Sequence, residues 1–107
     1  MQNILKQYQS IKEKYPGAVL LFRIGDFYET LNKDAKIVSK HSGILLQEVQ
    51  ATAGIQHLAS VPLNAVDATI RKLVKAGYQV ALCDQLEDPR NKRNIAKRGV
   101  TDLLKPS

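Results

Sequence analysis

The feature that most constrains the fold is an apolar run, Ala18–Ile24, which breaks at Gly25-Asp26 and resumes as Phe27-Tyr28-Glu29. Runs of strand-forming apolar residues are typical of buried strands, and a glycine beside an aspartate is typical of a sharp turn. We therefore predict a buried strand that turns into a second strand. Because side chains alternate along a strand, Phe27 and Glu29 point to one face of it and Tyr28 points to the other.

The rest of the chain predicts helices and strands that surround this pair. We expect Asp34 to cap a short helix that ends at Gly43, and Asn64 to cap a later helix that ends at Gly77. The expected helices cover residues 2–15, 34–42 and 64–76; the expected strands cover 18–24, 27–29, 44–49, 58–61, 78–85 and 100–104, with a loop over 50–57. This order favours an α/β fold, a mixed sheet of roughly six strands flanked by three or more helices.

The charge of the chain favours a polyanionic partner. Sixteen Lys and Arg against ten Asp and Glu give a net charge of +6. Five of the cations fall in a stretch that we expect to be an exposed loop, namely Arg90, Lys92, Arg93, Lys97 and Arg98. Such a loop suits salt-sensitive phosphate contacts that read no sequence, while runs of charge also occur on solvated loops that bind nothing.

Targeting segments are not visible in the sequence. The N-terminus lacks an apolar core of signal-peptide length, and no apolar run approaches a membrane span. The single cysteine, Cys83, fits a reducing compartment and a small buried side chain on a strand. We expect one cytoplasmic domain over residues 1–107 that does not bind membranes.

Few residues suggest catalysis. The sequence has no GxxxxGK[ST] loop for nucleotide phosphates, and His41 and His57 have no neighbours at metal-ligand spacing. The pairs Asp26/Glu29 and Glu87/Asp88 are a remote alternative, a Mg²⁺ site of a nuclease, but no lysine follows either pair at ordered spacing. The sequence thus predicts a protein that is not an enzyme.

Phe27 and Glu29 have a possible role in nucleic-acid binding. An exposed aromatic residue at a strand tip can wedge into a base step, most easily where pairing is already defective. A carboxylate beside it can hydrogen-bond to a base edge. The alternative is that Phe27 packs against its own turn.

Residues 21–29, LFRIGDFYE, resemble the signature of the N-terminal mismatch-recognition domain of MutS DNA mismatch-repair proteins, and the resemblance continues through CDQLEDP at 83–89 and over essentially the whole chain. It implies a single MutS domain I in which Phe27 stacks next to a mispaired or unpaired base and Glu29 hydrogen-bonds to that base. The implied partners are double-stranded DNA with mismatches or unpaired bases, and the remaining MutS domains or other repair proteins. No cofactor is implied for this chain, since ATP and Mg²⁺ belong to the ATPase domain of a full-length relative.

Two stretches depart from the family pattern. Gln47-Glu48-Val49 replaces T-(K/R)-R, and residues 60–65, SVPLNA, replace G-V-P-Y-H-A. The first change reduces the positive charge expected beside Phe27 and Glu29. It leaves open the alternative that the chain is an interaction protein that kept the fold and lost mismatch recognition. The sequence ends at Ser107, where the family continues into a connector, a lever and clamp, and a dimeric ATPase, so we expect weak, salt-sensitive binding with a modest mismatch preference.

Overall fold

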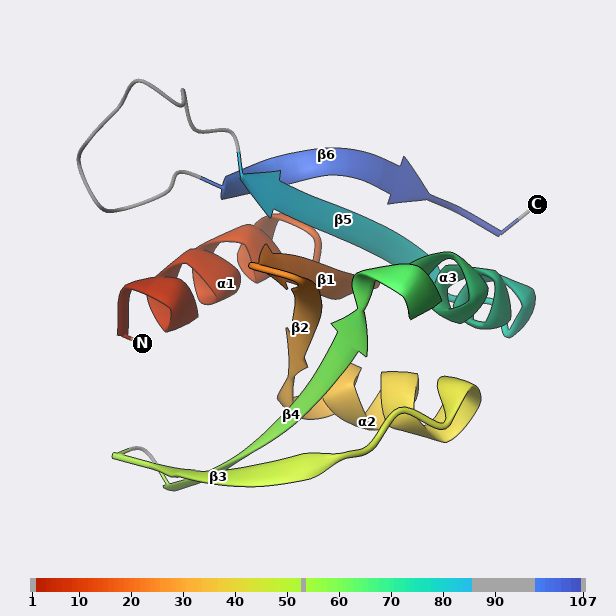
Figure 1. The fold of residues 1–107 in the computed structure, drawn as a ribbon. Coiled ribbons are helices and arrows are strands. Elements are labelled where there is room, and N and C mark those ends of the chain that lie inside the picture. Colours follow the sequence, from red (N-terminus) through yellow and green to blue (C-terminus); the bar gives the residue numbers. More distant parts are fainter. Residues whose placement is uncertain (1, 53, 86–97, 107) are drawn as a thin grey trace.

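The computed structural model describes residues 2–52, 54–85 and 98–106, with only the backbone described at residues 2–4, 51, 85 and 98. Over these residues the chain forms a six-stranded mixed sheet with helices on both faces (Figure 1). The elements are α1 (Gln2–Lys14), β1 (Ala18–Ile24), β2 (Phe27–Leu31), α2 (Asn32–Ser42), β3 (Gln47–Ala51), β4 (Gly54–Pro62), the 3-10 helix η1 (Leu63–Ala65), α3 (Val66–Lys75), β5 (Gln79–Gln85) and β6 (Arg98–Leu104). The α/β fold predicted from the sequence is confirmed.

The strand order is β3-β4-β2-β1-β5-β6. The β1–β5 pair is parallel, and the other pairs are antiparallel. The central strand β1 is buried on both faces from Ala18 to Phe22, which explains why its sequence is a continuous apolar run rather than an alternating one. The apolar run of the sequence is thus the middle of the sheet.

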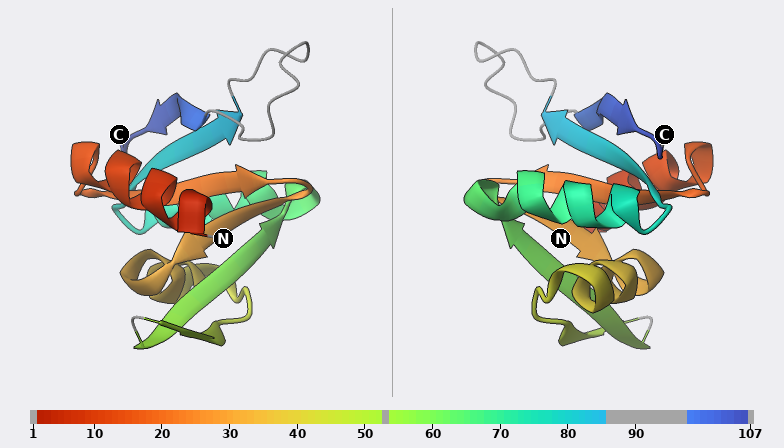
Figure 2. Two further views of the ribbon diagram at one scale, coloured as in Figure 1. Left: turned by 90° about the vertical axis from the view of Figure 1, so that its left-hand side faces the viewer. Right: turned by 90° about the vertical axis from the view of Figure 1, so that its right-hand side faces the viewer.

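The two faces of the sheet carry different helices. Figure 2 shows α1 in front of one face and α2 with α3 in front of the other. Tyr8 of α1 packs with Leu20 and Phe22, whereas Val38 of α2 and Leu73 of α3 pack in the cluster on the opposite face. These two cores sandwich the sheet.

The expected loop over 50–57 is wrong, and so are the bounds of the strands beside it. Residues 47–51 and 54–62 form an antiparallel hairpin, in which Gly54 adopts a φ of 107° and the strand expected to begin at Ile44 begins at Gln47. The hairpin was missed because β3 lies at the edge of the sheet, where it need not show an apolar face. The residues that pair with β4 show no clear alternation of apolar and polar side chains.

Both expected helix caps are also wrong. Residue Leu31 occupies the N-cap of α2, and Asp34 is buried in the first turn with its carboxylate turned toward α1 and β1. Asn64 lies within η1, and α3 follows it with no side-chain cap. The glycine stops are confirmed. Gly43 has a φ of 80° and donates its N–H to Ser39 O, and Gly77, which follows the C-cap of α3, has a φ of 96° and donates its N–H to Val74 O.

Candidate nucleic-acid interface

The tip that carries Phe27 is a tight turn between β1 and β2. Gly25 adopts a φ of 61°, a conformation that favours glycine, and Ile24 pairs directly with Phe27 on either side of the turn. The N–H of Leu63 donates to the carbonyl of Asp26 at 3.2 Å. This bond fastens the turn to the start of η1, so the tip is held by an element far away in the sequence.

Phe27 and Glu29 share one face of β2, as the sequence predicted. Glu29 pairs with Phe22, which belongs to the core under α1, whereas the next residue, Tyr28, lies in the core on the α2–α3 side. Phe27 is 44% exposed, while Tyr28 is 8% exposed. The ring of Phe27 is therefore available at the surface and is not enclosed by its own turn.

Glu29 is half-buried beside an apolar hollow of about 200 Å³. The side chains that line the hollow with it are Leu5, Tyr8, Phe22, Ile24, Leu31 and Leu58. From the neighbouring strand β4, the hydroxyl of Ser60 donates to Glu29 Oε2 at 2.5 Å. Within the described part of the chain Glu29 makes no ion pair, so its carboxylate has unused acceptor positions.

A polar cluster braces the turn from the opposite face. Arg23 donates from Nε to the carbonyl of Gly25 at 3.2 Å and from a terminal nitrogen to Asp84 Oδ2 at 3.2 Å. The Tyr28 hydroxyl donates to the same Asp84 oxygen at 3.4 Å. Burial, followed by the nearby carboxylate of Asp84, raises the pKa of Tyr28. The cluster joins β1, β2 and β5 directly behind Phe27, and sequence reasoning missed it because its members are 56 and 61 residues apart.

The basic stretch lies largely outside the described residues. This is true of Arg90, Lys92, Arg93 and Lys97. The expected loop is wrong at Arg98, which begins β6 because its backbone pairs with Gln85. Because β1 and β5 run parallel, Gln85 and Arg98 lie at the same end of the sheet as the turn after Ile24. Both described ends of the 86–97 segment are thus anchored at the end of the sheet that carries Phe27.

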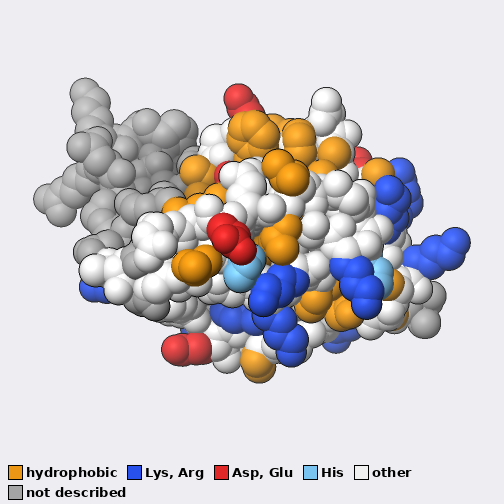
Figure 3. All heavy atoms as spheres, turned by 90° about the horizontal axis from the view of Figure 1, so that it is seen from below, with side chains coloured by type: hydrophobic (Ala, Val, Ile, Leu, Met, Phe, Trp, Pro, Cys, Tyr) orange, Lys and Arg blue, Asp and Glu red, His pale blue; other side chains and the backbone are white. Residues whose placement is uncertain are grey.

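Other cations lie on the opposite side of the sheet from Phe27. The exposed ones on the two helices there are Lys36 and Lys40 of α2 and Arg71, Lys72 and Lys75 of α3, whereas Lys33 of α2 lines the cleft beside α1. Figure 3 shows Lys and Arg side chains gathered on the underside of the molecule, where α2 runs. This part of the positive charge is separated from Phe27 and Glu29 by the thickness of the sheet.

The departure at Gln47-Glu48-Val49 lies on the edge strand β3, which pairs with residues 54–58 of β4. Phe27 and Glu29 pair instead with Pro62 and Ser60, further along β4. Glu48 Oε1 lies 3.6 Å from His57 Nε2 across the hairpin. The first altered stretch therefore belongs to the hairpin and does not pair with the residues opposite Phe27 and Glu29. In the second altered stretch, Ser60 contacts Glu29.

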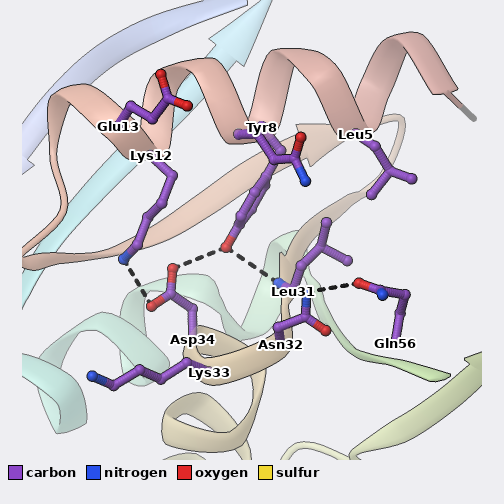
Figure 4. A pocket seen from close by; sticks show the side chains of 10 residues that line it. Leu5, Tyr8, Lys12, Glu13, Leu31, Asn32, Lys33, Asp34 and Gln56 are labelled. Carbon is purple, nitrogen blue, oxygen red and sulfur yellow. Dashed lines mark hydrogen bonds and ion pairs between the residues drawn. The ribbon is translucent and has the colours of Figure 1, made fainter. Parts of the chain in front are cut away.

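A cleft of about 410 Å³ separates α1 from the junction of β2 and α2 (Figure 4). At its base, Asp34 accepts hydrogen bonds from the Tyr8 hydroxyl at 2.9 Å, Lys12 Nζ at 3.0 Å and the N–H of Leu20 at 3.2 Å. Burial, then the charge of Asp34, strongly raises the pKa of Tyr8. The polar groups at the base of the cleft hydrogen-bond to one another, and this network ties α1 to the sheet.

The described residues contain no group of three or more His, Cys, Asp and Glu side chains that could hold a metal ion. His41 lies against the ring of Tyr78, with centroids 5.3 Å apart, and Glu87 and Asp88 fall outside the described residues. None of the described helices is long and apolar enough to cross a membrane.

Comparison with known proteins identifies relatives over nearly all of the chain. Residues 2–107 match the family model described as MutS domain I. The DNA mismatch repair protein MutS of Cytophaga hutchinsonii is 52% identical over 103 residues, which are 95% of this chain and 12% of that protein. The proteins of the same name from Flavobacterium johnsoniae and Porphyromonas gingivalis are 51% and 47% identical, each over 96% of this chain and 12% of the relative.

Proposed function

The chain belongs to the MutS domain I family, and from that premise we propose that it is a DNA-binding module that recognises mispaired or unpaired bases. Phe27 stacks against the defective base and Glu29 hydrogen-bonds to it. The chain spans 12% of the curated relatives it matches. Cooperation with the remaining MutS domains, which would supply the ATPase, is part of the same proposal.

The observation that carries this proposal is the exposed ring of Phe27 at the end of a braced turn, with Glu29 on the same face of the strand. Inserting an apolar wedge unstacks a base step at a cost of a few kcal/mol, and this free-energy cost is lower where base pairing is already lost. A turn whose backbone is already held in place loses less conformational entropy on insertion than a loose one. The bonds from Leu63 and Arg23 to the turn therefore favour wedging.

Glu29 fits the second half of the role because its carboxylate has acceptor capacity left beside Phe27. Asp26 is also exposed on the turn, and two carboxylates close to a phosphate backbone repel it. The proposed source of attraction to the backbone is the basic segment with Arg90, Lys92, Arg93, Lys97 and Arg98, because the described residues at its two ends, Gln85 and Arg98, lie at the end of the sheet that carries Phe27.

The test is a fluorescence anisotropy titration of the 107-residue chain with labelled duplexes that are matched, carry a G·T mismatch, or carry an unpaired T. Base stacking on an aromatic ring contributes about 1–3 kcal/mol, so Phe27→Ala should remove the preference for the defective duplexes and leave matched-duplex affinity unchanged. Leu45→Ala is the matched control, since Leu45 is 73% exposed and does not lie on the tip. Equal affinities of the wild type for all three duplexes would instead support a domain that has lost mismatch reading.

The basic segment is tested in the same titration repeated at several salt concentrations. Replacing Arg93 and Lys97 together by Ala should weaken binding to all duplexes alike and make the slope of log K against log salt shallower by roughly two. The paired control is Lys36→Ala with Lys40→Ala on α2, on the far side of the sheet, which should leave the slope unchanged. A slope that changes with the α2 pair and not with the first pair would contradict the assignment.

A further inference from the structure

Ser60 stands directly opposite Glu29 in the antiparallel β2–β4 pair. Here the serine hydroxyl donates to Glu29 Oε2 at 2.5 Å, within the range of a hydrogen bond from a hydroxyl to a carboxylate. The carboxylate beside Phe27 is thus held by a side chain of the neighbouring strand.

The surroundings of Glu29 make this hydrogen bond more important. The hollow beside it is lined by apolar side chains and by Tyr8, whose hydroxyl donates to Asp34. Among the described residues Ser60 provides the hydrogen-bond donor that reaches Glu29. Without that hydroxyl, the carboxylate is free to change rotamer.

We propose that Ser60 is a positioning residue that sets the base preference of Glu29. The inference rests on the proposed function, because it takes Glu29 to contact the defective base. A carboxylate offers about four acceptor positions on two oxygens; Ser60 occupies one on Oε2 and leaves Oε1 to accept a hydrogen bond from the base.

An acceptor held in place selects bases that present a donor to it. Thymine carries an N–H at N3 on its pairing edge, whereas cytosine carries an acceptor at that atom. An unpaired thymine and an unpaired cytosine otherwise require a similar distortion of the duplex, so the ratio of their affinities isolates the contact with Glu29. The wild-type chain is expected to bind the unpaired T more tightly than the unpaired C.

The experiment measures dissociation constants for duplexes with one unpaired T, one unpaired C, or none, using the 107-residue chain and its variants. Releasing one side chain from a fixed rotamer is worth about 3- to 10-fold in affinity, so Ser60→Ala should lower the T-to-C ratio by that factor. Ser60→Thr keeps the hydroxyl and suits a strand, and should restore the ratio. Thermal unfolding of each variant verifies that the fold is retained.

The outcomes separate the two proposals. If the wild type prefers unpaired bases over matched duplex and Phe27→Ala abolishes that preference, but Ser60→Ala keeps the T-to-C ratio, the role of Ser60 is wrong and the proposed function stands. If the wild type does not distinguish defective from matched duplexes, both are wrong. A lower ratio in Ser60→Ala that Ser60→Thr restores supports the positioning role, since a general loss of structure would lower both affinities together.

Discussion

Asp34 is the residue whose removal is expected to affect stability most through polar contacts. It is 3% exposed, and it accepts hydrogen bonds from three donors on two elements that are remote from it in sequence: Tyr8 and Lys12 of α1, and the N–H of Leu20 in β1. An Asp34→Ala change removes the acceptor and leaves these donors in place. The size of the effect depends on which of the donors can find another partner.

The backbone N–H of Leu20 is the costly one, because Leu20 is fully buried and an unsatisfied buried donor costs about 1–3 kcal/mol. Lys12 keeps a hydrogen bond to Ala18 O and is 29% exposed, so loss of its ion pair adds only about 0.5–1 kcal/mol. The Tyr8 hydroxyl still has Thr30 Oγ1 within 3.4 Å. We therefore expect Asp34→Ala to lower the free energy of unfolding by about 2–4 kcal/mol.

The assay is urea unfolding followed by far-UV circular dichroism, with the slope m compared between variants. Asp34→Asn, which keeps one carbonyl oxygen as an acceptor, should fall between the wild type and the alanine variant. Asp102→Ala is the control, because Asp102 is exposed on β6 and its removal should change stability by less than about 0.5 kcal/mol. If Asp34→Ala unfolds within that margin of the wild type at equal m, the network does not hold α1 to the sheet and the reasoning fails.

Two further changes test the core and the ionisation of Tyr8. Leu73→Ala should lower the free energy of unfolding by about 2–5 kcal/mol, because Leu73 is fully buried between α3 and the sheet. The neighbouring Lys72→Ala is the control and should leave the free energy of unfolding nearly unchanged. Equal losses of stability for the two variants in calorimetry would contradict the packing. Above pH 10, where unfolded chains lose the tyrosine proton, the raised pKa of Tyr8 keeps its phenol neutral in the folded state, so stability falls as pH rises. Tyr8→Phe should therefore show a shallower loss of unfolding temperature between about pH 9.5 and 11.5 than the wild type, and parallel curves would refute the assignment.

Sequence reasoning recovered those features that depend on residues close together in the chain. The apolar run from Ala18 predicted a buried strand, and the helix expected over 64–76 is found as η1 and α3. Alternation alone placed Phe27 and Glu29 on one face. In each case the period of the backbone directly sets the direction of the side chain.

Sequence reasoning failed where a residue's role depends on a partner far away in the chain. The loop expected over 50–57 contains the end of β3 and the start of β4. This hairpin was missed because main-chain pairing does not need an apolar pattern. A carboxylate in the first turn of a helix usually lies at a solvated helix end, and no local signal shows that Tyr8 and Leu20 turn Asp34 inward.

The sequence by itself determined the central strand, the turn at Gly25 and the shared face of Phe27 and Glu29, since these follow from the period and conformational freedom of neighbouring residues. Only the tertiary structure decided that the ring of Phe27 is exposed, that Arg23 and Asp84 brace the turn, and that Ser60 meets Glu29. These contacts depend on strand order and register, which bring together residues that are remote in the chain. Strand pairing across the sheet is a property of the whole fold, and for that reason no local stretch of sequence contains it.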